Sequence, residues 1–172
     1  NLSANFIPDK FFSLSNYINS GLPIKNIEIA NLAWQIVKKT EEKYISKKII
    51  ILDLDNTLWR GVLGEDGIKA IYSGQDELGY FFFIFQTFLK NLKDNGILLA
   101  AVSKNDQDLI EEAFKINKFP LDETDFIKLI GTYEPKSIQI KKLLSTINLT
   151  LDACLFIDDN ELELQEVKDN LN

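Results

Sequence analysis

The chain has 172 residues, of which 45% are hydrophobic, so we expect a globular fold with a substantial core. Its net charge of −7 and the absence of a basic stripe argue against a nucleic-acid partner, and no apolar run is long enough to predict a membrane span. The complete absence of histidine excludes histidine-based catalytic triads and histidine-ligated zinc.

The single cysteine, Cys154, excludes an internal disulfide and favours a reducing, cytoplasmic compartment. The first residue is asparagine, and no signal peptide is recognisable, so we expect the chain to be a piece of a longer protein. We predict two parts: residues 1–47, a leader and a helix that packs on the core, and residues 48–172, the catalytic core. The predicted N-terminal helix runs from Asn26, a good cap, to about Lys43.

The first predicted strand covers residues 49–52, four apolar residues that run directly into Asp53, Leu54, Asp55, Asn56 and Thr57. Asp53 and Asp55 are two residues apart on an extended chain end and therefore point the same way. Two such carboxylates repel each other and favour a hard divalent cation such as Mg²⁺, which binds oxygen ligands. The alternative is a strand that ends in an ordinary Asp/Asn-rich turn without a metal.

Residues 59–78 are rich in glycine and predict irregular structure with a small hairpin. About twenty residues are too few for a lid domain, so we expect an open site that admits large substrates. Glu65 and Asp66 within this segment are explained equally well by turn chemistry and by a functional role.

The remaining chain alternates helices and short apolar strands. The elements that we predict are a helix over 80–94, a strand over 97–102, a helix over 106–116, a strand over 126–130, a helix from Pro135 to about Ile147, a strand over 153–157 and a last helix to about Asn170. The first of these helices is apolar nearly all round at its start and should be deeply buried. This alternation is typical of a parallel sheet covered by helices on both faces, with ligands bound outside the carboxyl ends of the strands. Asp53, Ser103 and Asp158 follow or end predicted strands at that edge.

Several stretches resemble the haloacid dehalogenase (HAD) superfamily, and in particular its FkbH-like branch. They are DLDNT at Asp53–Thr57 within LDLDNTLWRGVLGEDG (Leu52–Gly67), GYFFFIFQTFLKNLKDNGILLAAVSKND (Gly79–Asp106), YEPKS (Tyr133–Ser137) and FIDDNELE (Phe156–Glu163). The resemblance implies a three-layer, Rossmann-like HAD core with a mainly parallel sheet and no large cap domain.

The resemblance also implies a role for each motif residue. Asp53 would be the nucleophile, Asp55 the general acid and base, and Mg²⁺ would bind Asp53, the backbone carbonyl of Asp55, and Asp159 or Asp158. Thr57 would orient Asp55 and contact the substrate phosphate, Ser103 would hydrogen-bond a phosphoryl oxygen, and Lys136 would neutralise its charge. Glu163 would support the metal or Lys136. The alternatives are that Ser103 only caps the next helix and that Lys136 is a solvated lysine of the first helical turn.

The FkbH-like branch implies dephosphorylation of 1,3-bisphosphoglycerate and transfer of the glyceryl unit to the phosphopantetheine thiol of an acyl carrier protein, as extender- or starter-unit supply in polyketide biosynthesis. The alternatives are a small-molecule phosphatase without acyl transfer and a non-catalytic docking domain of a multienzyme. Relatives often carry cysteine where this chain has Leu54, and Cys154 opens a predicted buried strand. We therefore expect direct transfer to the carrier thiol, without an acyl-cysteine intermediate.

Overall fold

The described part of the molecule is built around a parallel β-sheet. The computed structural model describes residues 47–75 and 79–171, which belong to the second of two units into which the chain divides, Ile45–Asn172. The sheet has the strand order β3-β2-β1-β4, with all neighbours parallel. The strands are β1 (Ile49–Leu52), β2 (Leu98–Ser103), β3 (Lys128–Gly131) and β4 (Cys154–Ile157). The helix predicted over residues 26–43 lies outside the described residues.

The central strand β1 explains why the sheet is covered on both faces. Its four side chains are buried, and they alternate between two hydrophobic clusters. Ile50 and Leu52 pack on one face with residues of α5 (Tyr80–Asp94) and α6 (Gln107–Ile116). Ile49 and Ile51 pack on the other face with residues of α7 (Lys136–Thr146) and α8 (Glu161–Leu171).

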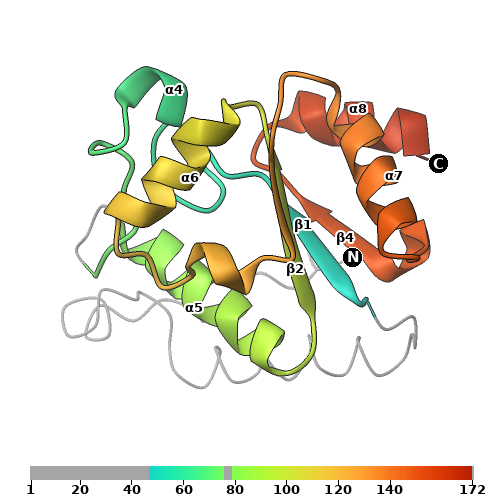
Figure 1. Ribbon diagram of the computed structural model, residues 1–172, viewed down its shortest axis with the longest axis horizontal. Helices are drawn as coiled ribbons and strands as arrows, with labels where there is room; N and C mark the ends of the chain where they lie inside the picture. The colour runs from blue at the N-terminus through green and yellow to red at the C-terminus, as the bar shows by residue number, and fades with distance from the viewer. Residues whose placement is uncertain (1–46, 76–78, 172) are drawn as a thin grey trace, which may run out of the picture. The chain divides into compact units, whose positions relative to one another are not determined.

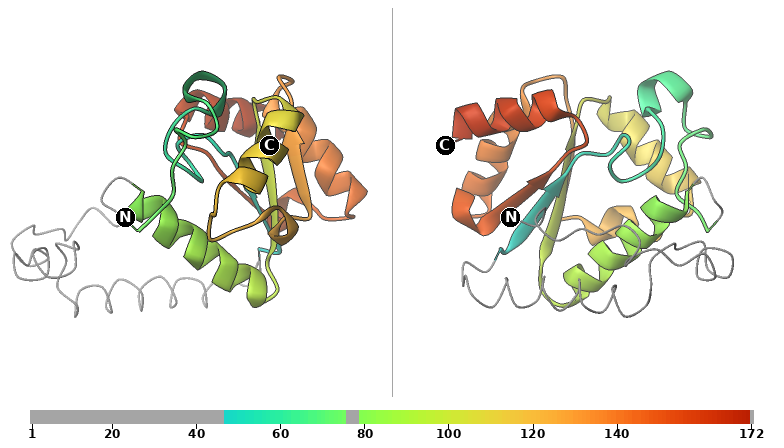
Figure 2. Two further views of the ribbon diagram at one scale, coloured as in Figure 1. Left: turned by 60° about the vertical axis from the view of Figure 1, so that its left-hand side comes forward. Right: turned by 180° about the vertical axis from the view of Figure 1, so that it is seen from behind.

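The helices complete a three-layer architecture. Figure 1 shows α5 and α6 on one side of the sheet and α7 and α8 on the other, and the two views of Figure 2 agree. This confirms the predicted α/β class with a Rossmann-like parallel sheet. Helices α5, α6 and α7 begin and end within one residue of the predicted limits, α8 ends one residue beyond the predicted Asn170, and β3 begins two residues later than predicted. Pro135 is the N-cap of α7 rather than its first helical residue.

Helix α5 is less buried than its apolar sequence predicts. Phe81 is 75% exposed and Phe88 is 56% exposed, whereas Gln86 is fully buried. The Gln86 side-chain amide donates to the Leu58 carbonyl (2.7 Å) and accepts from the Leu121 backbone N–H (3.2 Å). The prediction of a deeply buried helix is therefore wrong, because Phe81 and Phe88 are exposed while the polar Gln86 faces the core with its hydrogen bonds satisfied.

The described part of the segment between β1 and α5 has two isolated bridges, of which the first joins Asp55 to Trp59. Arg60 and Tyr72 form an isolated antiparallel bridge, as expected for a small hairpin, and a four-residue helix that we did not predict, α4 (Leu63–Asp66), lies between them. Gly61 adopts a φ of 100°, a conformation that favours glycine. Two 3-10 turns, η2 (Glu123–Asp125) and η3 (Leu151–Ala153), precede β3 and β4.

Within residues 47–75 and 79–171, none of the helices is both long enough and apolar enough to cross a lipid bilayer.

Candidate active site

The chain turns sharply after β1, and this turn positions the first two acidic residues. Three successive backbone N–H groups donate to the carbonyl of Leu54: those of Thr57, Leu58 and Trp59. Asn56 has a φ of 51°, and its side-chain oxygen accepts from the Gly61 N–H (3.0 Å). The Asp53 backbone N–H donates to the Ile157 carbonyl (2.9 Å), so the pairing of β1 with β4 continues to the residue before Asp158.

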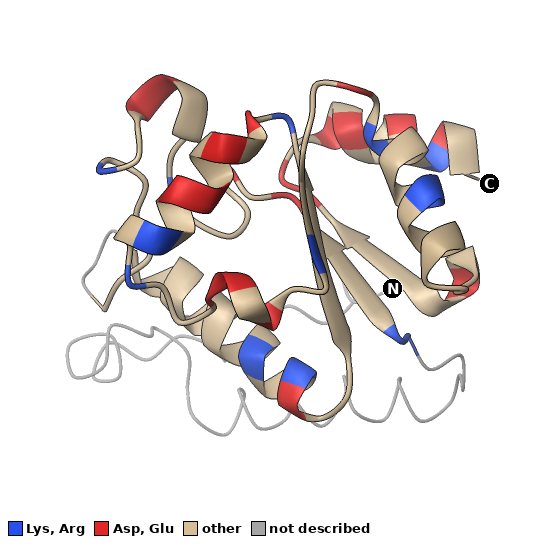
Figure 3. Ribbon diagram, viewed as in Figure 1, with Lys and Arg blue, Asp and Glu red and all other residues tan. Residues whose placement is uncertain are grey.

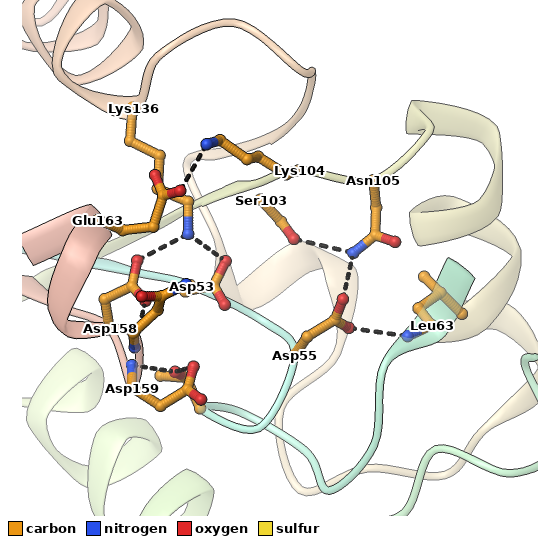
Figure 4. A network of polar contacts seen from close by, with 12 residues as sticks. Asp53, Asp55, Leu63, Ser103, Lys104, Asn105, Lys136, Asp158, Asp159 and Glu163 are labelled. Carbon is orange, nitrogen blue, oxygen red and sulfur yellow. Dashed lines mark hydrogen bonds and ion pairs between the residues drawn. The ribbon is translucent and has the colours of Figure 1, made fainter. Parts of the chain in front are cut away.

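Three carboxylates therefore meet at the carboxyl ends of β1 and β4. Oxygens of Asp53, Asp158 and Asp159 all lie within 4.8 Å of one another. Figure 3 shows acidic residues on the loops after these strands, and Figure 4 shows the side chains converging. Asp53 and Asp158 are buried, and Asp159 is exposed. Three carboxylates that present only oxygen ligands suit a hard divalent cation.

Lys136 is the buried cation of this cluster. Its ammonium lies 2.7 Å from Asp53 Oδ1 and 2.6 Å from Asp158 Oδ2, and the residue is 3% exposed. The alternative of a solvated lysine is therefore wrong. Three carboxylates against one ammonium leave two negative charges uncompensated, which is the charge that a divalent cation would balance.

Burial and pairing act in opposite directions on the two central groups. Burial raises the pKa of Asp53 to about 6; the ammonium of Lys136 opposes this rise, and Asp158 adds to it. Burial lowers the pKa of Lys136, but Asp53 and Asp158 together raise it by more, so the net shift is upward. Lys136 therefore stays protonated at neutral pH. For Asp53, the raised pKa means that burial destabilises the ionised carboxylate.

Thr57 contacts Asp159. The Thr57 hydroxyl donates to Asp159 Oδ1 (3.2 Å) and accepts from the Asp159 backbone N–H (3.1 Å). This differs from our expectation that Thr57 orients Asp55. The contact ties the turn after β1 to the loop after β4, and it fixes the exposed member of the carboxylate cluster.

Asp55 faces away from the carboxylate cluster, into a cage of hydrogen-bond donors. Its Oδ1 accepts from the Trp59 indole Nε1 and from the Leu63 backbone N–H, both at 3.0 Å. Its Oδ2 accepts from Asn105 Nδ2 at 2.8 Å. The third ligand of the predicted metal site, the Asp55 backbone carbonyl, remains a prediction.

Ser103 is the last residue of β2 and is buried beside this cage. The N-cap of α6 is Asp106, so the alternative that Ser103 caps this helix is wrong. The Ser103 Oγ accepts from Asn105 Nδ2 (3.0 Å).

The remaining candidates have other partners. Glu163 Oε1 lies 2.5 Å from the Lys104 ammonium (Figure 4), whereas the ion pairs of Lys136 are with Asp53 and Asp158. The Asp66 carboxylate accepts from the Val62 N–H (2.7 Å) at the start of α4, which is ordinary turn chemistry.

Cys154 pairs in register with Ile49, at the opposite end of the sheet from the acidic cluster. Burial raises the pKa of its thiol to about 11, although Lys47 opposes this.

Three residues at this site had no role in our sequence analysis: Trp59, Asn105 and Lys104. A signal existed for Asn105, because it follows Ser103 by two residues at the end of a strand, where side chains of that spacing share one face. Trp59 gave no such signal, since an indole in an apolar stretch is equally explained by packing. Its ring does stack on Phe119, with centroids 5.5 Å apart.

The chain is similar to the solved N-terminal part of the protein BF1531 from Bacteroides fragilis, described as containing a phosphatase domain complexed with Mg: 31% identity, a TM-score of 0.74, and coverage of 95% of this chain and 44% of that one. No protein-family model matches the chain. No curated protein matches it either.

Two more distant structures share part of the fold. A 3-deoxy-D-manno-octulosonate 8-phosphate phosphatase from Moraxella catarrhalis is 20% identical with a TM-score of 0.49, over 71% of this chain and 63% of that chain. A protein from Porphyromonas gingivalis, described as a predicted HAD-like family hydrolase, is 12% identical with a TM-score of 0.47, over 72% of this chain and 87% of that chain.

The Bacteroides fragilis protein shares this α/β fold over 95% of the present chain, and its description as containing a phosphatase domain complexed with Mg agrees with an acidic cluster at the carboxyl edge of the sheet. The present chain spans 44% of the length of the Bacteroides fragilis protein that it matches.

Proposed function

We propose that this chain is a HAD-type phosphatase domain that acts on a small phosphorylated substrate through a phospho-aspartate at Asp53. The observation that carries the proposal is the buried Asp53–Lys136–Asp158 cluster, in which an acidic side chain at the end of a strand is held by one ammonium at 2.7 Å. The Bacteroides fragilis protein, described as a phosphatase domain complexed with Mg, supports the same assignment.

In this proposal the site residues carry out phosphoryl transfer in two steps. A carboxylate oxygen of Asp53 attacks phosphorus, a P–O bond forms, and the bond from phosphorus to the leaving oxygen breaks as Asp55 gives that oxygen a proton. Water then attacks the phospho-aspartate, passes its proton to Asp55, and releases phosphate and the free Asp53 carboxylate. Ser103 would donate to a phosphoryl oxygen, and Lys136 would lower the negative charge that the attacking carboxylate meets.

Asp53, Asp158 and Asp159 would hold Mg²⁺, since they supply oxygen ligands within 4.8 Å of one another and two uncompensated charges. When bound, the ion would neutralise charge on the phosphoryl oxygens. Thr57 holds Asp159 in place from the turn that carries Asp53. Thr57 would therefore position a ligand of the metal. A contact between Thr57 and the substrate phosphate remains a prediction.

The experiment is phosphate release from p-nitrophenyl phosphate with Mg²⁺, for the wild type and for Asp53→Asn. The matched control is Asp108→Asn, the same chemical change at an exposed position of α6. We expect wild-type turnover, loss of all but about 1% of it in Asp53→Asn, in line with the rate factors of positioned nucleophiles and acids, and full activity in Asp108→Asn. Comparable activity in all three proteins would contradict the proposal.

The motifs quoted above support a finer version of this proposal. In it, the substrate is 1,3-bisphosphoglycerate, the phosphate ester is hydrolysed at Asp53, and the thiol of an acyl carrier protein's phosphopantetheine arm displaces the acyl phosphate. The products would be a glyceryl thioester and two phosphates. The support is the sequence resemblance, foremost LDLDNTLWRGVLGEDG at Leu52–Gly67. The position of Cys154 and the raised pKa of its thiol favour direct transfer to the carrier.

Intact-protein mass spectrometry of a carrier protein incubated with the chain and 1,3-bisphosphoglycerate separates the candidates. A glyceryl adduct on the carrier supports the finer proposal. Phosphate release without an adduct leaves the small-molecule phosphatase, and neither signal leaves the non-catalytic docking domain.

A further inference from the structure

Asn105 contacts both Asp55 and Ser103, two residues of the proposed reaction, but has no step of its own in it. It follows β2 by two residues and is 3% exposed. Its Nδ2 donates to Asp55 Oδ2 at 2.8 Å and to Ser103 Oγ at 3.0 Å, so both of its N–H bonds are used (Figure 4). The nitrogen must face Asp55, because the opposite amide orientation would press a carbonyl oxygen against a carboxylate.

The contact with Ser103 fixes the polarity of that hydroxyl. A serine hydroxyl has one hydrogen to donate and accepts through its lone pairs. Because Asn105 donates to Ser103 Oγ, the serine hydrogen is left to point elsewhere. Ser103 is thereby prepared as a donor, which is the role that a phosphoryl oxygen requires.

The contact with Asp55 selects one oxygen of its carboxylate. A carboxylate accepts about four hydrogen bonds, two on each oxygen. Oδ1 already accepts from Trp59 and from the Leu63 N–H, whereas Oδ2 accepts from Asn105 alone. Oδ2 therefore keeps one free site, and any proton that Asp55 exchanges with a substrate passes through this atom.

The backbone around Asn105 is packed tightly enough to hold this arrangement. A Cβ on Gly131, at the end of β3, would lie 2.7 Å from the Asn105 carbonyl oxygen, so a side chain there would displace the loop. The Gly131 N–H also donates to Gln107 Oε1 (2.7 Å), which anchors the first turn of α6 to the same strand.

We propose that Asn105 is a positioning residue that sets both the donor polarity of Ser103 and the proton-transfer geometry of Asp55, an inference that rests on the proposed phosphatase function. Its loss should matter most where the leaving group needs a proton. An alkyl phosphate leaves as a strongly basic alkoxide unless it is protonated, whereas p-nitrophenolate leaves readily without a proton.

The test compares kcat/KM for glycerol phosphate and for p-nitrophenyl phosphate in four proteins: wild type, Asn105→Ala, Ser103→Ala and Asn117→Ala. Asn117 is the matched control, because its side-chain amide also makes two hydrogen bonds, to the Ile68 and Ala113 carbonyls, away from the acidic cluster. kcat/KM is used because it includes the step in which the leaving group departs.

Asn105→Ala should lower kcat/KM for glycerol phosphate at least about tenfold more than for p-nitrophenyl phosphate, a part of the usual factor for general acid catalysis. Ser103→Ala should lower both by a similar factor, and Asn117→Ala should change neither. If Asn105→Ala does not fold, Asn105→Ser replaces it, since a single hydroxyl hydrogen cannot serve both partners.

An equal loss for the two esters, or no loss, in a folded Asn105 variant would overturn the inference while leaving the proposed function intact. A wild type that hydrolyses neither ester would overturn the proposed function and this inference with it.

Discussion

Neutralising Asp53 should stabilise the metal-free protein at neutral pH. Asp53 is buried beside Asp158, and burial raises the pKa of Asp53 to about 6 from its usual 3.8 even though Lys136 lies 2.7 Å away. A carboxyl group with a raised pKa holds its proton more tightly in the folded state than in the unfolded chain. The ionised side chain therefore lowers the free energy of unfolding, and Asp53→Asn removes this cost while it retains the shape of the residue.

The size of the effect follows from the pKa difference. A rise from 3.8 to about 6 corresponds to about 3 kcal/mol, at about 1.4 kcal/mol for each pH unit between the two values. The sign is fixed by proton binding: between these pH values the folded wild type holds a proton that the unfolded chain has released, so its stability falls as the pH rises. Below pH 3.8 the group is neutral in both states, and above about pH 6 the full cost is present.

The assay is denaturant unfolding in EDTA at intervals from pH 4 to pH 8, with the wild type, Asp53→Asn and the exposed control Asp108→Asn. The free energy of unfolding of Asp53→Asn minus that of the wild type should grow by about 3 kcal/mol between pH 4 and pH 7 and then level off. The exposed control Asp108→Asn should not show this rise. A difference for Asp53→Asn that shrinks or stays constant with rising pH would refute the reasoning, because the ionised carboxylate would then not be destabilising.

Three further predictions concern the other parts of the site. Above its dissociation constant, Mg²⁺ should raise the melting temperature in proportion to the logarithm of its concentration. Asp159→Ala should lose most of this shift in the same thermal titration. An unchanged melting curve in the wild type would contradict the metal site. Lys136→Met should cost about 3 kcal/mol or more in denaturant unfolding at pH 8, because it leaves two buried carboxylates without their cation, and the cost should be smaller at pH 5; a stability equal to that of the wild type would contradict the pairing. Cys154→Ala should leave phosphate release and any carrier loading unchanged and cost on the order of 1 kcal/mol in stability; loss of loading with continued phosphate release would make Cys154 an acyl relay.

The sequence predicts the sheet and its acidic edge well, because these depend on local patterns. β1 matches the prediction at both ends, since four apolar residues run directly into Asp53. The expectation that Asp53, Ser103 and Asp158 gather at one edge needs only the rule that parallel strands present their carboxyl ends together, and Lys136 follows from the family resemblance.

The features that the sequence did not predict depend on partners far along the chain. Gln86 faces the core because its amide meets groups of Leu58 and Leu121, 28 and 35 residues away, and no helical periodicity reveals this. Thr57 turned out to contact Asp159, 102 residues away, rather than its near neighbour Asp55. The donor cage of Asp55 likewise combines Trp59 with Asn105, 50 residues from Asp55, so it exists only after the sheet has formed.

The central claim is that Asp53 is the nucleophile, and trapping the phospho-aspartate tests it most directly. The wild type is mixed with p-nitrophenyl phosphate and Mg²⁺, quenched in acid within the first turnover, and digested for peptide mass spectrometry. The account predicts one phosphoryl group on the peptide that contains Asp53, and none in Asp53→Asn treated in the same way. Turnover of the substrate with the phosphoryl group on another residue, or with undiminished activity in Asp53→Asn, would contradict it.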